Sequence, residues 1–301
     1  KGEVSFSGGI RLTGNEATIH NRKTSVPDAR FVFNNFGFSM AFKPARDPDS
    51  RHVIAFSNTQ VFNFFNSTRM SGYTNSSSIA KDMLTLANEQ GHPNDLNYNY
   101  EGLGFETFLL DTVDNRFISL LDTKRSVSQT RDLVTTGRMN DQNFSYAYSH
   151  KDKFYFGGSL GIPRITYEST TTHYEVDDKD SMQINFSQGS YTHTYKDSMP
   201  YLNSYYSSLG GFNSLTYTEY FKTTGTGFNV KLGGIMRVND LVRVGLYYHT
   251  PTVYRLADVY YNELSVTFDQ NKSTAETSAN PVEGVGEFNY RVITPGRAGA
   301  N

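Results

Sequence analysis

Thr224–Leu256, TGTGFNVKLGGIMRVNDLVRVGLYYHTPTVYRL, is the stretch from which the rest of the chain can be interpreted. Apolar residues take the even positions of 228–238 and 242–248, whereas charged residues and glycines take most of the odd positions. Side chains that alternate with a period of two point to opposite faces of a β-strand. The stretch therefore predicts a long β-hairpin with one apolar face and one polar face.

The length of the two runs indicates what kind of sheet the hairpin belongs to. Each run has about a dozen residues, which exceeds the ~5–6 typical of globular strands and is enough to cross a membrane at ~45° tilt. The apolar parity carries no charge, while Lys231, Arg237 and Arg243 share the other parity. A soluble sheet with its charged face in water would show a similar alternation. Length and charge together favour a strand pair of a transmembrane β-barrel.

The same pattern predicts the register of the hairpin. Directly opposed residues must point to the same face of a sheet, so the connection must hold an odd number of residues. We expect a three-residue loop, Asn239-Asp240-Leu241, that opposes Arg237 to Arg243 and Lys231 to His249. A slip by one residue would place Arg243 in lipid, which costs ~2–4 kcal/mol near the bilayer midplane.

Composition excludes several classes of protein. The 301 residues are 37% hydrophobic and 14% aromatic with no Trp, their mean hydropathy is −0.53, and no apolar run approaches the ~20 residues of a transmembrane helix. The net charge of −2 gives no reason to expect nucleic acid as a partner. The absence of cysteine excludes disulfides, thiolate catalysis and cysteine-bound zinc.

Strand patterns recur along the chain and are separated by connections of two lengths. We expect eight strands, at 4–12, 31–43, 52–65, 142–149, 154–167, 228–238, 242–248 and 286–294. Short turns are expected at 44–51, 150–153 and 239–241, and longer connections at 13–30, 66–137, 168–214 and 256–284. Short turns on one side and long loops on the other are typical of bacterial outer-membrane barrels. The fold class is therefore predicted to be all-β, an antiparallel transmembrane barrel forming one domain over 1–301.

Several strands also resemble a known family. The stretches concerned are GTGFNVKLG from Gly225, LYYHTPT from Leu246, FGGSLGIP from Phe156 and YRVITP from Tyr290. They resemble the FadL-type outer-membrane transporters of long-chain fatty acids and other hydrophobic compounds, whose members include proteins labelled hemin receptor. The similarity covers most strands and none of the long loops, so it is specific for the family and unspecific for the substrate.

The resemblance implies a monomeric barrel in the outer membrane of a Gram-negative bacterium, with about fourteen strands, plugged by an N-terminal hatch. This chain would then be an internal piece with about eight of those strands, lacking the hatch and the closing strands. The resemblance also implies an extracellular hydrophobic groove built by loop helices and a lateral exit through a kinked strand, for which 52–65 is the candidate.

The insertion 66–137 is expected on the extracellular side. Ser78–Asn88 and Gly102–Thr112 have helical spacing, with Ser78 as the N-cap and Gly91 as the terminator of the first helix. Packed together, the helices could leave a groove for an acyl chain, or form a small closed cap. The candidate groove residues are Met83, Leu86, Phe105, Phe108 and Leu109.

Cations on the polar parity are the other candidate ligand contacts. Like charges opposed on a sheet repel each other, so Arg237 and Arg243 should have an anion beside them. This anion could be a carboxylate of the hatch or of a neighbouring strand, or the head group of a fatty acid. We expect Lys231 and His249, which lie further from the turn, to contact ligand, and the two arginines to anchor the plug.

Other functions have less support in the sequence. Gly157–Gly161 matches Gly-x-Ser-x-Gly, but it lies within the expected strand 154–167 and no Ser/His/Asp or Ser/His/Asn set stands out beside it. Glu89 and His92 have Glu-x-x-His spacing, but no His-x-x-x-His pair occurs and the histidines are scattered. We therefore expect no enzyme, no metal site and no cofactor. The expected partners are outer-membrane lipid and a hydrophobic small molecule. An alternative is a non-transporting barrel that serves as a subunit of a larger outer-membrane assembly, with the tyrosine-rich segment 191–220 contacting other proteins.

Overall fold

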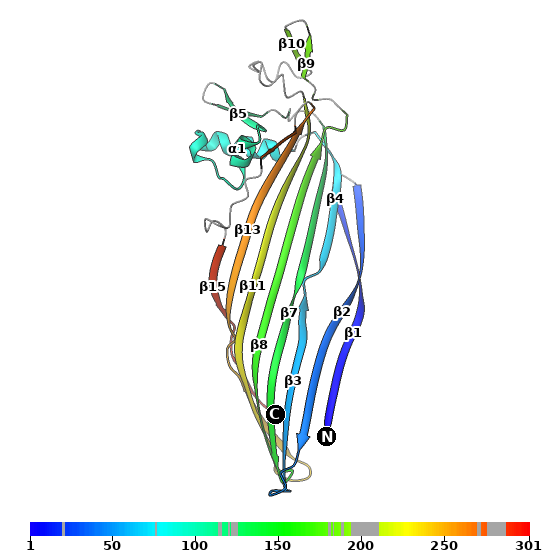
Figure 1. Ribbon diagram of the computed structural model, residues 1–301, viewed down its shortest axis with the longest axis vertical. Coiled ribbons are helices and arrows are strands. Elements are labelled where there is room, and N and C mark those ends of the chain that lie inside the picture. Colours follow the sequence, from blue (N-terminus) through cyan, green and yellow to red (C-terminus); the bar gives the residue numbers. More distant parts are fainter. Residues whose placement is uncertain are drawn as a thin grey trace.

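The computed structural model describes residues 1–19, 22–75, 77–113, 116–119, 121, 126–179, 182, 184–187, 190–193, 211–269, 272–275 and 287–301. These residues form mainly antiparallel β-sheet with short helices. Figure 1 shows a tall, narrow, curved sheet with short turns at one end, toward which both termini lie, and the helices at the other end. We refer to these as the turn end and the helix end.

Six long strands lie side by side in sequence order, and shorter strands complete the sheet. The long strands are β1 (Gly2–Ile19), β2 (Arg22–Phe42), β3 (Ser50–Asn63), β7 (Val127–His150), β8 (Phe154–Val176) and β11 (Phe212–Arg237). β4 (Asn66–Thr74) follows β3 and, like β3, pairs with β7. β11 pairs with both β12 (Arg243–His249) and β13 (Val253–Phe268). Outside these, β16 (Arg297–Ala300) pairs with β12, and β15 (Glu287–Ile293) pairs with β13. The short strands are β5 (Leu110–Val113), β6 (Arg116–Ser119), β9 (Ile184–Ser187), β10 (Ser190–His193) and β14 (Lys272–Ala275). The all-β, antiparallel class is thereby confirmed. Within the described part of the chain, the edges at β1 and at β15 and β16 do not pair with each other.

The expected loop at 13–30 is wrong. β1 and β2 form a continuous ladder from Gly2–Met40 to Ile19–Arg22, so this segment is the far half of a long hairpin. The segment is predicted as a loop because its residues are mostly polar, show no apolar alternation and include Pro27. Proline is tolerated in a strand that pairs on one side only, and this part of β2 pairs with β1 alone.

The other long connections are also shorter than expected. β7, β8 and β11 have 24, 23 and 26 residues, about 75–85 Å at ~3.3 Å per residue. The outer parts of 66–137, 168–214 and 256–284 are therefore strand. Polar side chains on both faces, as at 169–172, hide part of these strands, although Leu264, Val266 and Phe268 alternate with Ser265 and Thr267 in the last of them. The short turns at 44–51, 150–153 and 239–241 are confirmed.

The hairpin register is confirmed. Lys231 pairs with His249 and Arg237 with Arg243, and the N–H of Val238 donates to the carbonyl of Val242 at 3.0 Å. The side chain of Asn239 accepts from the N–H groups of Leu241 and Val242 at 2.9 and 2.8 Å, which closes the turn.

The two faces of the sheet differ. Odd positions of β7, β8 and β11 share the face on which the helices lie, which we call the helix-bearing face; even positions share the opposite face. Among the described residues, the buried apolar core lies at the helix end, where Leu215 of β11 and Leu264 of β13 are 1% and 0% exposed. Leu232 and Leu246, on the opposite face near the turn end, are 54% and 64% exposed. They do not pack on the helix-bearing face.

Three helical segments lie at the helix end: α1 (Ile79–Gln90), the 3-10 turn η1 (Pro93–Asp95) and α2 (Glu101–Glu106). The helix expected at 78–88 is confirmed, with Ser78 as N-cap and Gly91 as C-cap at φ 78°. The second helix is shorter than expected, because β5 takes over at Leu110. None of the described helices has the length and apolar character needed to span a membrane.

Candidate functional site

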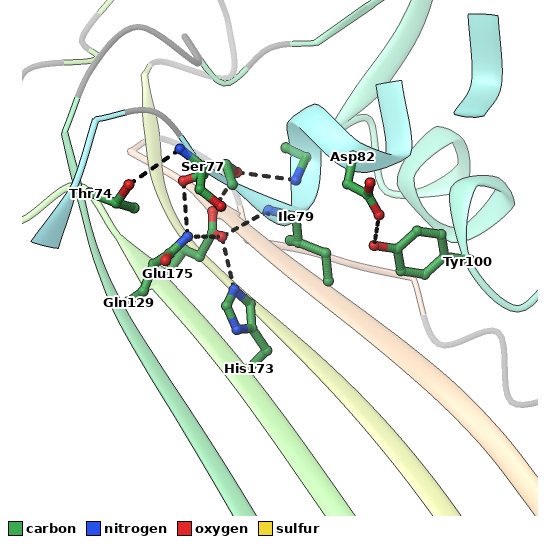
Figure 2. Close-up of polar contacts among 10 residues, drawn as sticks. Thr74, Ser77, Ile79, Asp82, Tyr100, Gln129, His173 and Glu175 are labelled. Atoms are coloured by element: carbon green, nitrogen blue, oxygen red, sulfur yellow. Dashed lines mark hydrogen bonds and ion pairs between the residues drawn. The ribbon is translucent and has the colours of Figure 1, made fainter. Parts of the chain in front are cut away.

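One buried carboxylate, Glu175 of β8, holds α1 to the sheet (Figure 2). It accepts hydrogen bonds from the Ser78 hydroxyl at 2.6 Å and from the Ile79 N–H at 2.9 Å. The side chains of Gln129 and His173 donate to it at 2.8 Å each. Negative charge is favourable at a helix N-terminus, where unsatisfied N–H groups carry partial positive charge. Glu175 therefore fixes both the position and the direction of α1.

Three further hydrogen bonds join the residues just before α2 to the rest of the structure. The Tyr100 hydroxyl donates to Asp82 of α1 at 2.6 Å (Figure 2), and burial, assisted by this carboxylate, raises the pKa of Tyr100. The backbone carbonyl of Asn99 accepts from Tyr217 of β11 at 3.2 Å and from Asn262 of β13 at 2.8 Å. We call the unit formed by α1, η1, α2, β5 and β6 the cap.

The five candidate groove residues do not share one environment. Met83 and Leu109 are 0% exposed within the core of the cap, whereas Leu86 and Phe105 are half-buried. Phe108 is 37% exposed and has a positive φ of 60°. Two candidates are therefore packed inside, and one lies at the surface. A groove between the helices stays a prediction.

A row of apolar residues crosses the helix-bearing face between the cap and the turn end. It runs through Phe62, Met139, Ile165, Gly225, Leu256 and Tyr290, which face one another on six neighbouring strands. A side chain on Gly225 would lie 2.5 Å from Leu256, so glycine leaves room for Leu256 to cover this strand. The row and the adjacent rings form what we call the aromatic band: Phe62, Phe64, Met139, Ile165, Tyr167, Phe221, Leu256, Tyr260, Phe288 and Tyr290.

Ring contacts connect the band across strands. The centroids of Phe62 and Phe64 are 4.9 Å apart, those of Phe64 and Tyr167 are 5.2 Å apart, and those of Tyr167 and Phe221 are 6.1 Å apart. These distances are typical of favourable aromatic pairs. Even so, Phe62 and Phe221 are 56% and 37% exposed. The band is therefore an accessible apolar surface.

On β13 and β15, the band contains one carboxylate, and hydroxyl groups donate hydrogen bonds to it. Tyr260 stacks on Phe288 at 5.9 Å. Between them and the apolar row, Asp258 accepts from the Thr223 hydroxyl at 2.6 Å and from the Tyr290 hydroxyl at 3.2 Å. Because two hydroxyls hydrogen-bond to Asp258, its charge does not disrupt the apolar surface.

The structure brings Lys231 and His249 together below the band. Both line a cavity of about 810 Å³. The Lys231 ammonium donates to Asp141 at 3.0 Å and to Asn143 at 2.9 Å, and its side chain is 31% exposed. Asp141 lies on β7 and could not be recognised as its partner from the sequence. Lys231 is thus a paired cation that an anionic ligand could approach, and its contact with ligand stays a prediction.

Arg237 and Arg243 face each other as expected. The anion beside Arg237 is Asp240 of the turn, three residues further along the chain. For Arg237 the neighbouring anion is thus a carboxylate of the turn itself, and neither of the two sources that the sequence suggested. A role for the two arginines in anchoring a plug stays a prediction.

The third long strand is interrupted at Phe64 and Phe65, between β3 and β4. Here the Phe64 N–H donates to the Gly137 carbonyl at 3.1 Å, and the Phe64 carbonyl accepts from the Thr135 hydroxyl at 2.6 Å. The Phe65 N–H donates to the side chain of Asn63 at 2.9 Å. Gly137 has a φ of +116°, which other residues rarely adopt. The break lies at the end of 52–65, the segment proposed for a kink.

Beside this break, side-chain contacts join β1 and β2 to Phe65 and β4, in place of a backbone ladder. β2 pairs with β3 only over Asn35–Phe42. Beyond that, the Asn15 amide donates to the Ser67 carbonyl at 2.7 Å, and the Arg30 guanidinium lies 4.6 Å from the centre of the Phe65 ring. Such contacts can separate without disrupting a sheet ladder.

Some expectations about the site remain untested. Among the described residues, no three His, Asp or Glu side chains are grouped to hold a metal ion. Of the tyrosine-rich segment 191–220, residues 194–210 lie outside the described part of the chain. The aromatic band and the Glu175 contacts were missed in the sequence, because they join residues that only strand pairing places together.

Comparison of the chain with family models, curated proteins and solved structures gave no match. Family and function therefore have to be argued from the arrangement of the residues themselves. That arrangement consists of the cap, the aromatic band, the Lys231–Asp141 pair and the broken third strand. The band and the Lys231–Asp141 pair lie on the helix-bearing face, between the cap and the turn end, and the break lies at the edge of the band.

Proposed function

We propose that this chain is part of an outer-membrane β-barrel channel that takes up hydrophobic or amphipathic small molecules, such as long-chain fatty acids. In this proposal the opposite face contacts lipid and the helix-bearing face lines the lumen. The cap then lies on the extracellular side, because long loops of such barrels are extracellular and short turns are periplasmic.

The aromatic band carries the proposal. The lumen of an outer-membrane barrel is ordinarily polar, and a water-filled pore gains nothing from exposed Phe, Leu and Ile side chains. A channel for hydrophobic solutes needs such a surface, because a ligand that covers it removes apolar area from water at ~25 cal/mol per Å². The band lies directly below the cap, where a ligand that has passed the cap would arrive.

The broken third strand supports a sideways exit from the band. Phe62 and Phe64 belong both to the band and to the end of β3, and the wall next to them is held by Asn15 and Arg30 side chains. A hydrophobic ligand that moved from Tyr167 past Phe64 would reach the lipid without crossing the polar turn end. This route agrees with the lateral exit implied by the family resemblance.

Lys231 offers a contact for a carboxylate head group on the turn-end side of the band. In the ligand-free state Asp141 neutralises it. A bound carboxylate would share the ammonium, which has three donors. Replacing Lys231 with Met should weaken fatty-acid binding and spare an uncharged analogue. Replacing Asp141 with Asn should strengthen fatty-acid binding, and equal loss of both ligands in Lys231→Met would show a structural role.

The central experiment measures binding of a fluorescent fatty acid to the folded chain in detergent and in vesicles. Phe221→Gln and Ile165→Gln should weaken binding about tenfold, which corresponds to ~1.4 kcal/mol. Val134→Gln is the matched control, since Val134 is equally exposed at 37% and lies at a similar height on the opposite face. Unchanged binding in both band variants would refute the channel and favour the scaffold alternative.

A further inference from the structure

A furrow runs along the opposite face near the turn end, away from the lumen surface. It consists of two adjoining hollows of about 540 Å³ each, which share Tyr146, Gly158 and Leu232. Gly158 and Gly234 form its floor. A Cβ at Gly158 would lie 3.2 Å from Leu232, and one at Gly234 would lie 3.4 Å from Phe156. The two glycines therefore keep the furrow open.

The walls of the furrow are apolar. The first hollow lies between Phe38, Phe56, Phe144 and Leu160, and the second between Phe156 and Leu246. Among the described residues, no charged side chain lines either hollow. Its shape and chemistry fit a hydrocarbon chain lying along the sheet.

Five rings lie at the turn end of the furrow, and we call them the belt: Phe42, His52, Tyr146, Tyr148 and His150. His52 stacks on Phe42 at 5.3 Å and contacts Tyr148 at 5.1 Å. Its Nδ1 bonds to the Tyr146 hydroxyl at 2.7 Å, and Nδ1 of His150 bonds to the Tyr148 hydroxyl at 3.3 Å. Both imidazoles use Nδ1 within the belt, so Nε2 is the atom that can reach outward. Tyr146 and Tyr148 also line the furrow, which makes furrow and belt one continuous surface.

Beyond the belt, two of the short turns, 44–51 with the adjacent Lys43 and 150–153, carry more cations than carboxylates. The cations are Lys43, Arg46, Arg51, Lys151 and Lys153, and the carboxylates are Asp47, Asp49 and Asp152. The surface thus passes from apolar side chains to hydroxyl and imidazole groups and then to positive charge. A phospholipid has the complementary order of acyl chain, glycerol ester and anionic phosphate. Basic residues beside membrane-spanning segments attract anionic lipid head groups.

We propose that the furrow and belt bind one phospholipid from the membrane leaflet on the turn side. One acyl chain lies over Gly158 and Gly234, and the phosphate lies against His52 and His150. This inference rests on the proposed function for its membrane, but it concerns a different face and a different ligand. The lipid is a resident of the wall and is not the transported molecule.

The test uses the full chain purified from membranes and analysed by native mass spectrometry with added phosphatidylglycerol. Gly158→Leu fills the furrow and should weaken retention of the lipid about tenfold, or ~1.4 kcal/mol. Ala147→Leu is the matched control. Ala147 is exposed, lies on the helix-bearing face opposite Gly157 of β8, and lines neither hollow. This control should retain the lipid as the unmodified chain does.

A second variant tests the head-group contact without filling the furrow. The double substitution His52→Phe and His150→Phe keeps the rings and should abolish any preference for phosphatidylglycerol over an uncharged diacylglycerol. If the chain inserts into bilayers but Gly158→Leu and the double variant retain lipid unchanged, the lipid site is refuted and the channel is not. If the unmodified chain does not insert into bilayers, both proposals fail.

Discussion

The two ends of the molecule differ in how far their apolar side chains are buried. At the helix end, Met83, Leu103 and Leu264 are 0–1% exposed, because the cap folds over the strand ends as in a water-soluble protein. At the turn end, Leu232 and Leu246 are 54% and 64% exposed on a face that the described part of the chain leaves uncovered. The apolar side chains of the first region are buried by contacts within the chain, whereas those of the second are left exposed.

In the proposed channel, this difference would match the two surroundings of the chain, with water around the cap and lipid around the turn end. Loop closure and helix packing in the cap depend on the hydrophobic effect in water. The turn end would be stabilised by lipid, which replaces the missing core. Between them lies the aromatic band, which is apolar yet uncovered by cap or lipid, and this is the surface that we assign to the ligand.

Leu103→Ala should have the largest effect and only at the helix end. Removing this buried side chain should destabilise the cap by about 2–5 kcal/mol. Hydrogen exchange of the α1 amides would measure the loss, while the amides of β12 stay protected. Leu232→Ala is the comparison at the turn end and should leave α1 unchanged. Equal deprotection of both regions would show that the two ends unfold as one unit.

Leu246→Arg should come next and affect insertion. An arginine on the opposite face near the membrane midplane costs ~2–4 kcal/mol, and less toward the interfaces. Tyr247→Arg is the control, because this neighbouring residue points to the helix-bearing face at the same height. Denaturant titrations of folding into vesicles would compare them. A larger loss for Tyr247→Arg would mean that the faces are assigned the wrong way round.

Glu175→Gln should loosen α1 without disturbing the turn end. Hydrogen bonds to a charged group contribute about 1.5–3 kcal/mol, and four groups donate to this buried carboxylate. Glu168→Gln removes a carboxylate of the same strand whose exposed ion pair with Lys222 spans 3.9 Å, worth about 0–1 kcal/mol. Proteolysis of the cap should accelerate in the first variant and stay unchanged in the second.

Alkaline pH should have the smallest effect, again confined to the cap. The pKa of Tyr100 is raised in the folded cap, whereas an unfolded tyrosine titrates near ~10. Tyr100 therefore makes its full contribution to the free energy of unfolding below pH ~10, and this contribution is lost as the pH rises through and above that value. We expect less than about 1 kcal/mol per pH unit, since the group is partly exposed and screened. Tyr100→Phe should flatten this dependence in hydrogen-exchange measurements of α1, and an unaltered slope would contradict it.

Local patterns in the sequence determined several parts of the fold. The alternation at 228–248 predicted the register that opposes Lys231 to His249, because a period of two leaves few ways to pair two faces. Ser78 and Gly91 marked the ends of α1, since capping depends on neighbouring residues. The short turns were recognisable for the same reason.

Only the tertiary structure decided where strands continue beyond their apolar part and which distant residues meet. The polar halves of β1 and β2 have no alternation, so the ladder alone shows them to be strand. Asp141 reaches Lys231, and Ser78 reaches Glu175, across about 90 or more residues of sequence. The aromatic band takes one or two residues from each of several strands, and no one segment of the sequence contains enough of them to reveal it.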